Sequence, residues 1–134
     1  MRVEDKLAQE VSDYIAIQYP KVIAHFDTGS GGRTTIGMAM RNKRLNKKNG
    51  YPDLFIAERG YIRESDGLII SSYMGLFIEL KVKSPYLKDG KTLRADNHIH
   101  EQAEMLAKLV GKGYKAVFGV GFDHCKEIID DYLT

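Results

Sequence analysis

The chain has 134 residues, 43% of them hydrophobic, and a formal net charge of +2. This is enough apolar material for one domain with a buried core, and it leaves little room for a second. No apolar run approaches the roughly 20 residues that a membrane span needs, the first residues are too charged for a secretory signal, and one cysteine, Cys125, cannot form an internal disulfide. We therefore expect a single domain over residues 1–134, without a membrane partner, in the reducing cytoplasm.

Helical periodicity predicts a first helix over residues 3–19, which Pro20 ends, and a short strand follows at residues 21–26. Residues 27–50 are rich in glycine and basic side chains and have no clear period. We expect a long functional loop there, with at most a helical turn at "TIGMAMRNKRL".

A small meander of strands is expected after this loop, with "ESDG" as a hairpin turn; its strands are placed at residues 53–58, 68–72 and 75–83. A helix at 95–111, the buried strand "KAVFGVGF" and a closing helix at 123–133 follow. The order α-β-β-β-β-α-β-α predicts an α/β fold whose helices flank a central mixed sheet.

The strand "GLFIELKVK" carries the first chemical signal, because strict alternation places Glu79 and Lys81 on one face and Ile78 on the other. Taken alone, this is the pattern of a solvent-facing ion-pair stripe. Asp53, however, opens another strand of the meander, and pairing of the two strands would bring its carboxylate beside Glu79. Two like charges in that position need a cation between them, and carboxylate oxygens select Mg²⁺ or Mn²⁺. Lys81 could then stabilise charge developing on phosphorus, which indicates phosphodiester hydrolysis.

A run of basic residues with no acidic residue among them precedes Asp53: Arg33, Arg41, Lys43, Arg44, Lys47 and Lys48. Such a segment is a candidate contact for a polyanion such as DNA, and the alternative is a solvated, mobile loop. "GSGGRTT" within the same stretch lacks the GK[ST] ending of a Walker loop. His98 and His100 are two positions apart, so they lack the spacing of a helical metal pair; they are surface residues or phosphate contacts.

These motifs together resemble a known family. "YPD" at 51–53 and "ELK" at 79–81 fit the PD-(D/E)xK nuclease signature, and nearly the whole chain is similar to the virus-type replication-repair nuclease (VRR-NUC) domain. The matching positions are Glu4 in an early helix, "GYPD" from Gly50, "IELK" from Ile78, Gln102 in "HEQAEML" and "GKGYKAVFGV" from Gly111.

The resemblance implies a restriction-endonuclease-like core that cuts DNA with Mg²⁺ or Mn²⁺. It implies that Asp53, Glu79 and the backbone carbonyl of Leu80 bind the metal and that Lys81 is the catalytic lysine. It also makes Glu4 a helical acid of the catalytic and metal site and Gln102 a hydrogen-bonding partner for water or phosphate. From the residues alone, Glu4 could equally complement the helix dipole, and Gln102 could be an ordinary surface residue.

Short stand-alone members of this family are associated with homodimers that resolve four-way (Holliday) junctions. The resemblance therefore implies a branched-DNA endonuclease that forms a homodimer and is encoded by a phage or prophage in a bacterial host. The alternative is a DNA-binding or structural module that keeps a nuclease fold with little or no cleavage. A metal-dependent cleavage assay separates the two.

Overall fold

The computed structural model describes residues 2–27, 35–46 and 48–134. Its central sheet has four strands in the spatial order β1 (Ala24–Phe26), β2 (Leu54–Ile56), β5 (Leu76–Lys81) and β6 (Lys115–Val120). β2 runs antiparallel to both β1 and β5, whereas β5 and β6 are parallel. The predicted α/β fold with a mixed central sheet is therefore confirmed.

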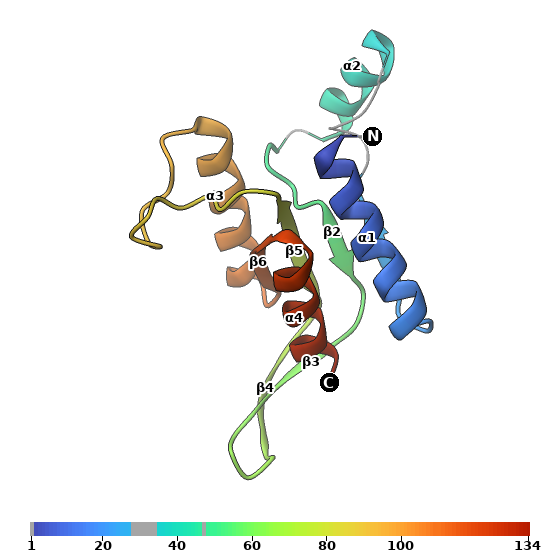
Figure 1. Ribbon diagram of the computed structural model, residues 1–134, viewed down its shortest axis with the longest axis vertical. Coiled ribbons are helices and arrows are strands. Elements are labelled where there is room, and N and C mark those ends of the chain that lie inside the picture. The colour runs from blue at the N-terminus through green and yellow to red at the C-terminus, as the bar shows by residue number, and fades with distance from the viewer. Residues whose placement is uncertain (1, 28–34, 47) are drawn as a thin grey trace.

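Helices cover both faces of this sheet (Figure 1). α1 (Val3–Gln18) and α4 (Gly121–Leu133) lie on one face, where Val11 and Ile129 pack against Ile78. α3 (Asn97–Gly111) lies on the other face, where Ile99 packs against Phe77. In the described part of the chain, no helix has the length and apolar character that a membrane span requires.

The alternation predicted for β5 is confirmed. Leu76 and Ile78 belong to the core beneath α1 and α4, and Phe77 belongs to the core beneath α3. Because successive side chains of a strand point to opposite faces, Glu79 lies on the α3 side with Phe77. The strand is buried on both faces, which explains why its sequence is an almost continuous apolar run.

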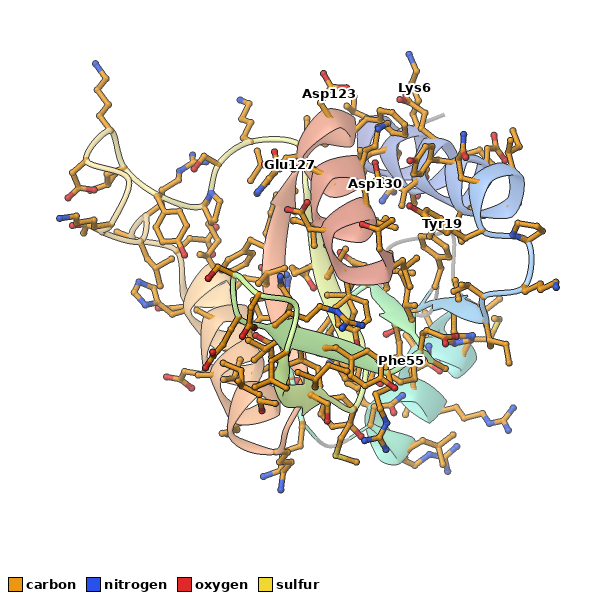
Figure 2. All side chains as sticks on the ribbon, turned by 90° about the horizontal axis from the view of Figure 1, so that it is seen from below. Lys6, Tyr19, Phe55, Asp123, Glu127 and Asp130 are labelled. Atoms are coloured by element: carbon orange, nitrogen blue, oxygen red, sulfur yellow. The ribbon has the colours of Figure 1, made fainter. Side chains whose placement is uncertain are left out.

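A polar cluster joins α1 to α4. The Asp130 carboxylate accepts hydrogen bonds from the hydroxyl groups of Tyr14 and Tyr19, at 2.5 and 2.7 Å, and from Lys126 Nζ at 2.8 Å. Figure 2 shows Asp130 beside Tyr19 at this junction of the two helices. The bond from Lys126, followed by those from the two tyrosines, lowers the pKa of Asp130 to about 2, so the carboxylate stays ionised.

The stretch expected to be a long loop contains a helix, α2 (Ile36–Leu45), where at most a helical turn was predicted at "TIGMAMRNKRL". The position of this turn was right, but its length was underestimated. Thr35 caps this helix by accepting a hydrogen bond from the Met38 backbone N–H at 3.1 Å. None of the residues of α2 is buried, and Ile36 is 81% exposed. A helix that packs against no core needs no apolar stripe, so periodicity carried no signal for it.

The pairing expected between the strand of Asp53 and the strand of Glu79 is confirmed, but the order of strands in the predicted meander was wrong. β3 (Gly60–Arg63) and β4 (Ile69–Tyr73) form a separate two-stranded hairpin, and β2 pairs directly with β5. The "ESDG" turn does connect the hairpin strands, since the Glu64 N–H donates to the Leu68 carbonyl. The observed order is α-β-α-β-β-β-β-α-β-α, which adds α2 and β3 to the prediction. Strand patterns show where strands lie along the chain, but they did not indicate that β3 and β4 form a sheet of their own.

Candidate active site

Antiparallel pairing of β2 and β5 brings Asp53 level with Glu79. Leu54 is the register partner of Ile78, so the residue before Leu54 faces the residue after Ile78. Asp53 Oδ2 accepts a hydrogen bond from the Leu80 backbone N–H at 2.9 Å, which fixes its carboxylate at the end of β5. Glu79 is buried, with 4% of its surface exposed, and Asp53 is half-buried.

The two carboxyl groups titrate as a pair. Burial, followed by the negative charge and hydrogen bonding of Asp53, raises the pKa of Glu79 to about 9. Burial is also the largest cause that raises the pKa of Asp53. The positive charge of Lys81 favours ionisation of both groups without outweighing their burial. At neutral pH the pair therefore holds a proton unless a cation takes its place.

One oxygen of Glu79 is left without a hydrogen-bond donor. Glu79 Oε1 accepts from Gln102 Nε2 at 2.7 Å, whereas Glu79 Oε2 is buried with no partner in the described structure. A buried acceptor of this kind is unfavourable unless a proton, a water or an ion satisfies it. Hard oxygen ligands on two adjacent carboxylates fit Mg²⁺ or Mn²⁺.

The backbone of Leu80 faces the same site. The N–H and C=O groups of a strand residue point toward the same edge of the strand, and the Leu80 N–H reaches Asp53. β2 begins at Leu54, opposite Ile78, so no residue of β2 lies opposite Leu80. The carbonyl of Leu80 is therefore expected on the same edge of β5 as its N–H, and its place in the ligand set stays a prediction.

Two further side chains approach the pair and were missed as site residues. His98 Nε2 lies 3.2 Å from Gln102 Nε2, so the Gln102 amide lies between Glu79 and His98. The Asp27 backbone N–H donates to the Asp53 carbonyl at 2.8 Å, and the Asp27 charge contributes to raising the Asp53 pKa. The i, i+4 spacing of His98 and Gln102 is a signal that the sequence does contain. Asp27 carried no such signal, because only the pairing of β1 with β2 brings it near.

The structure does not bring Glu4 to this pair. Its side chain is exposed in the first turn of α1, and α1 covers the face opposite α3. Within the described ranges, no group of three or more His, Cys, Asp or Glu side chains is arranged to hold a metal ion. The predicted set of Asp53, Glu79 and Glu4 is therefore not assembled.

The basic segment divides into a described and an undescribed part. Arg41, Lys43 and Arg44 are exposed on α2, and Lys48 is exposed in the link that follows it. The predicted contacts Arg33 and Lys47 lie outside the described residues. Figure 1 shows α2 projecting from the body beside the start of α1.

Gly50 holds the turn that carries Asp53 against α3. Its φ of +82° is in the left-handed region, and a Cβ at this position would lie 2.8 Å from the Glu101 carbonyl oxygen. We expect Gly50→Ala to lower the free energy of unfolding by about 1–3 kcal/mol, measured by denaturant titration. The matched control is Gly90→Ala, because Gly90 has a φ of +71° and open space around it, so it isolates the backbone strain. Equal losses in both variants would argue against the close contact with α3.

Comparison with known proteins supports the same architecture. No protein-family model and no curated protein matches the sequence. A solved structure described as a VRR_NUC domain protein matches with a TM-score of 0.63 and 24% sequence identity, over 99% of this chain and 89% of that chain.

The chain has the VRR-NUC fold. Its mixed sheet and flanking helices form a restriction-endonuclease-like core. Asp53 directly precedes β2 of this core, β5 supplies Glu79 and Lys81, and α3 supplies Gln102.

Proposed function

We propose that this chain is a metal-dependent DNA endonuclease that hydrolyses phosphodiester bonds. The observation that carries the proposal is the Asp53–Glu79 pair: Glu79 is buried near the end of β5 with one unpartnered oxygen, and the half-buried Asp53 carboxylate accepts from the next residue of β5, Leu80. Lys81 lies two residues further along that strand, and its charge acts on both carboxyl groups. A nuclease function also agrees with the VRR-NUC fold.

In this proposal, Asp53, Glu79 and the Leu80 carbonyl hold Mg²⁺ or Mn²⁺. The ion, when bound, acts as a Lewis acid and lowers the pKa of water. The ammonium group of Lys81 orients the attacking water and offsets negative charge on the phosphate in the transition state. Gln102 keeps Glu79 in place through Nε2, and its unpartnered Oε1 can accept a hydrogen bond from water. The buried core of β5 and α3 keeps these side chains in fixed positions.

The test is incubation of the wild-type protein with supercoiled plasmid and with branched DNA, in Mg²⁺ or Mn²⁺ and in EDTA. Products that require the divalent ion support the endonuclease. DNA binding without metal-dependent products would favour the alternative of a binding module that does not cut.

Branched DNA is the substrate class that we propose, and a homodimer is the form that would cut it. The resemblance to VRR-NUC members that resolve four-way junctions supports both parts of this proposal. The same resemblance is the basis for proposing a phage or prophage origin. Two copies related by a two-fold axis would place two sites on the two halves of a four-way junction. Light scattering measures the mass of the protein in solution, and a comparison of junction with linear duplex measures the preference. A monomer that cuts both DNAs equally would contradict this part of the proposal.

The basic segment gives a further prediction. Alanine substitutions that remove the charge of the segment should weaken binding to DNA of any sequence; the substituted residues are Arg41, Lys43, Arg44 and Lys48. Each phosphate contact that is lost should flatten the plot of log affinity against log salt by roughly one unit. Fluorescence anisotropy over a salt titration, in a Lys81→Ala background that does not cut, measures both effects. If neutralisation leaves the slope unchanged, the segment is a solvated surface without a role in binding.

A further inference from the structure

Residues 82–96 connect β5 to α3, and we call them the finger. The finger is ordered by its own hydrogen bonds: the Leu87 N–H donates to the Thr92 carbonyl, and the Arg94 N–H donates to the Pro85 carbonyl. Tyr86 and Leu93 form an antiparallel bridge. The base of the finger is fixed to the body, since Pro85 is fully buried and Leu93 packs against the core beneath α3. The finger is therefore a hairpin-like projection with a defined shape.

The basic and the acidic residues of the finger differ in their contacts. Its four basic residues are all exposed: Lys83, Lys88, Lys91 and Arg94. Its two acidic residues make hydrogen bonds inside the structure. The Asp89 carboxylate accepts from the Thr92 hydroxyl and from the backbone N–H groups of Thr92 and Lys91, and these hydrogen bonds lower its pKa. Asp96 caps α3 by accepting from the His98 N–H. No ion pair in the part of the chain that the structure describes involves a basic residue of the finger.

The finger starts at the candidate active site. β2 begins and β5 ends at the same edge of the sheet, because the two strands are antiparallel. The chain reaches this edge from α2, passes through Asp53, and later leaves it from Lys81 into the finger. The finger, in yellow to orange, lies at the left of both figures, whereas α2 lies at the upper right in Figure 1 and at the lower right in Figure 2. Two basic projections, α2 and the finger, therefore flank the edge of the sheet that carries Asp53 and Glu79.

We propose that the finger binds the phosphate backbone of DNA on the opposite side of the active site from α2. This proposal rests on the proposed function and adds a second contact surface to it. Unpaired lysine and arginine side chains on an ordered projection bind phosphates without sequence preference, because they recognise charge and not bases. A duplex that crosses the edge of the sheet would contact α2 with one arm and the finger with the other. The scissile phosphate would then lie between the two contacts, at Lys81.

The test compares variants of the full chain by fluorescence anisotropy with a fluorescein-labelled DNA duplex, in EDTA so that the DNA stays intact. The alanine variant carries Lys88→Ala, Lys91→Ala and Arg94→Ala. We expect its affinity at 0.15 M salt to fall on the order of 10- to 100-fold, and its salt slope to flatten by roughly two to three units. The charge-preserving variant carries Lys88→Arg, Lys91→Arg and Arg94→Lys and should keep the wild-type slope, since each phosphate contact needs only the positive charge.

A control removes two exposed lysines at the opposite ends of the sheet strands: Lys21→Ala, before β1, and Lys112→Ala, before β6. Far-UV circular dichroism checks that all variants are folded, as is expected for exposed side chains. If the wild-type protein binds DNA and the alanine variant keeps the slope of the control, the finger proposal is overturned and the proposed function stands. If the wild-type protein neither binds nor cuts DNA, both are overturned.

Discussion

Lys81→Ala is expected to reduce DNA cleavage on the order of 100- to 1,000-fold, because it removes one positive charge from the place where charge develops in the transition state. Lys81 is half-buried at the end of β5, and its ammonium acts on both Asp53 and Glu79. The substitution removes little core volume, so the melting temperature should stay within a few degrees of wild type. Single-turnover cleavage of plasmid in Mn²⁺, with enzyme in excess, measures the chemical step.

The control for this experiment is Lys112→Ala, an exposed lysine that directly follows α3, which should leave cleavage unchanged. Binding of the Lys81→Ala protein to DNA, measured in EDTA, should stay within a few-fold of wild type, since Lys81 is only one of many basic residues. A Lys81→Ala protein that cuts DNA at the wild-type rate would remove Lys81 from the proposed chemistry.

Glu79→Gln is expected to have opposite effects on function and on stability. In the wild-type protein the folded-state pKa of Glu79 is about 9, against an ordinary value of 4.5. The folded protein therefore binds the carboxyl proton of Glu79 more tightly than the unfolded chain does. The stability of the metal-free protein is therefore highest below the unfolded pKa and declines as the pH rises from about 4.5 toward 9. A neutral glutamine removes that penalty. We expect Glu79→Gln to raise the free energy of unfolding by about 1–3 kcal/mol at pH 8 in EDTA, and to change it little at pH 4.5.

The same variant should lose metal binding, because a neutral amide oxygen replaces a charged ligand. Calorimetry with Mn²⁺ measures this loss, and Asp53→Asn should show it as well. Denaturant titrations at pH 4.5 and pH 8 measure the stability difference. Glu104→Gln is the control, since Glu104 is an exposed carboxylate on α3 and does not belong to the pair. Unchanged Mn²⁺ affinity in both site variants, or a Glu79→Gln protein that is less stable than wild type at pH 8, would contradict the proposed pair.

Much of the active strand could be predicted from the sequence alone. The alternation in "LFIELK" places Glu79 and Ile78 on opposite faces of the strand, as observed. The presence of a strand that begins near Asp53 was predicted correctly as well. Both features depend on local geometry, because a strand exposes its side chains to alternate faces whatever its neighbours are. The same local reasoning predicted α1, α3 and α4 from their apolar spacing.

The sequence did not determine which elements meet, because pairing and burial depend on residues far apart in the chain. The β3–β4 hairpin forms a sheet of its own, β1 brings Asp27 to Asp53, and α2 forms without a core beneath it. Glu4 shares a helical stripe with buried residues, yet α1 packs on the face away from Glu79. The chemistry of Glu79 is also a tertiary property: its raised pKa comes first from burial and then from the Asp53 charge. Only the folded sheet brings those two causes together.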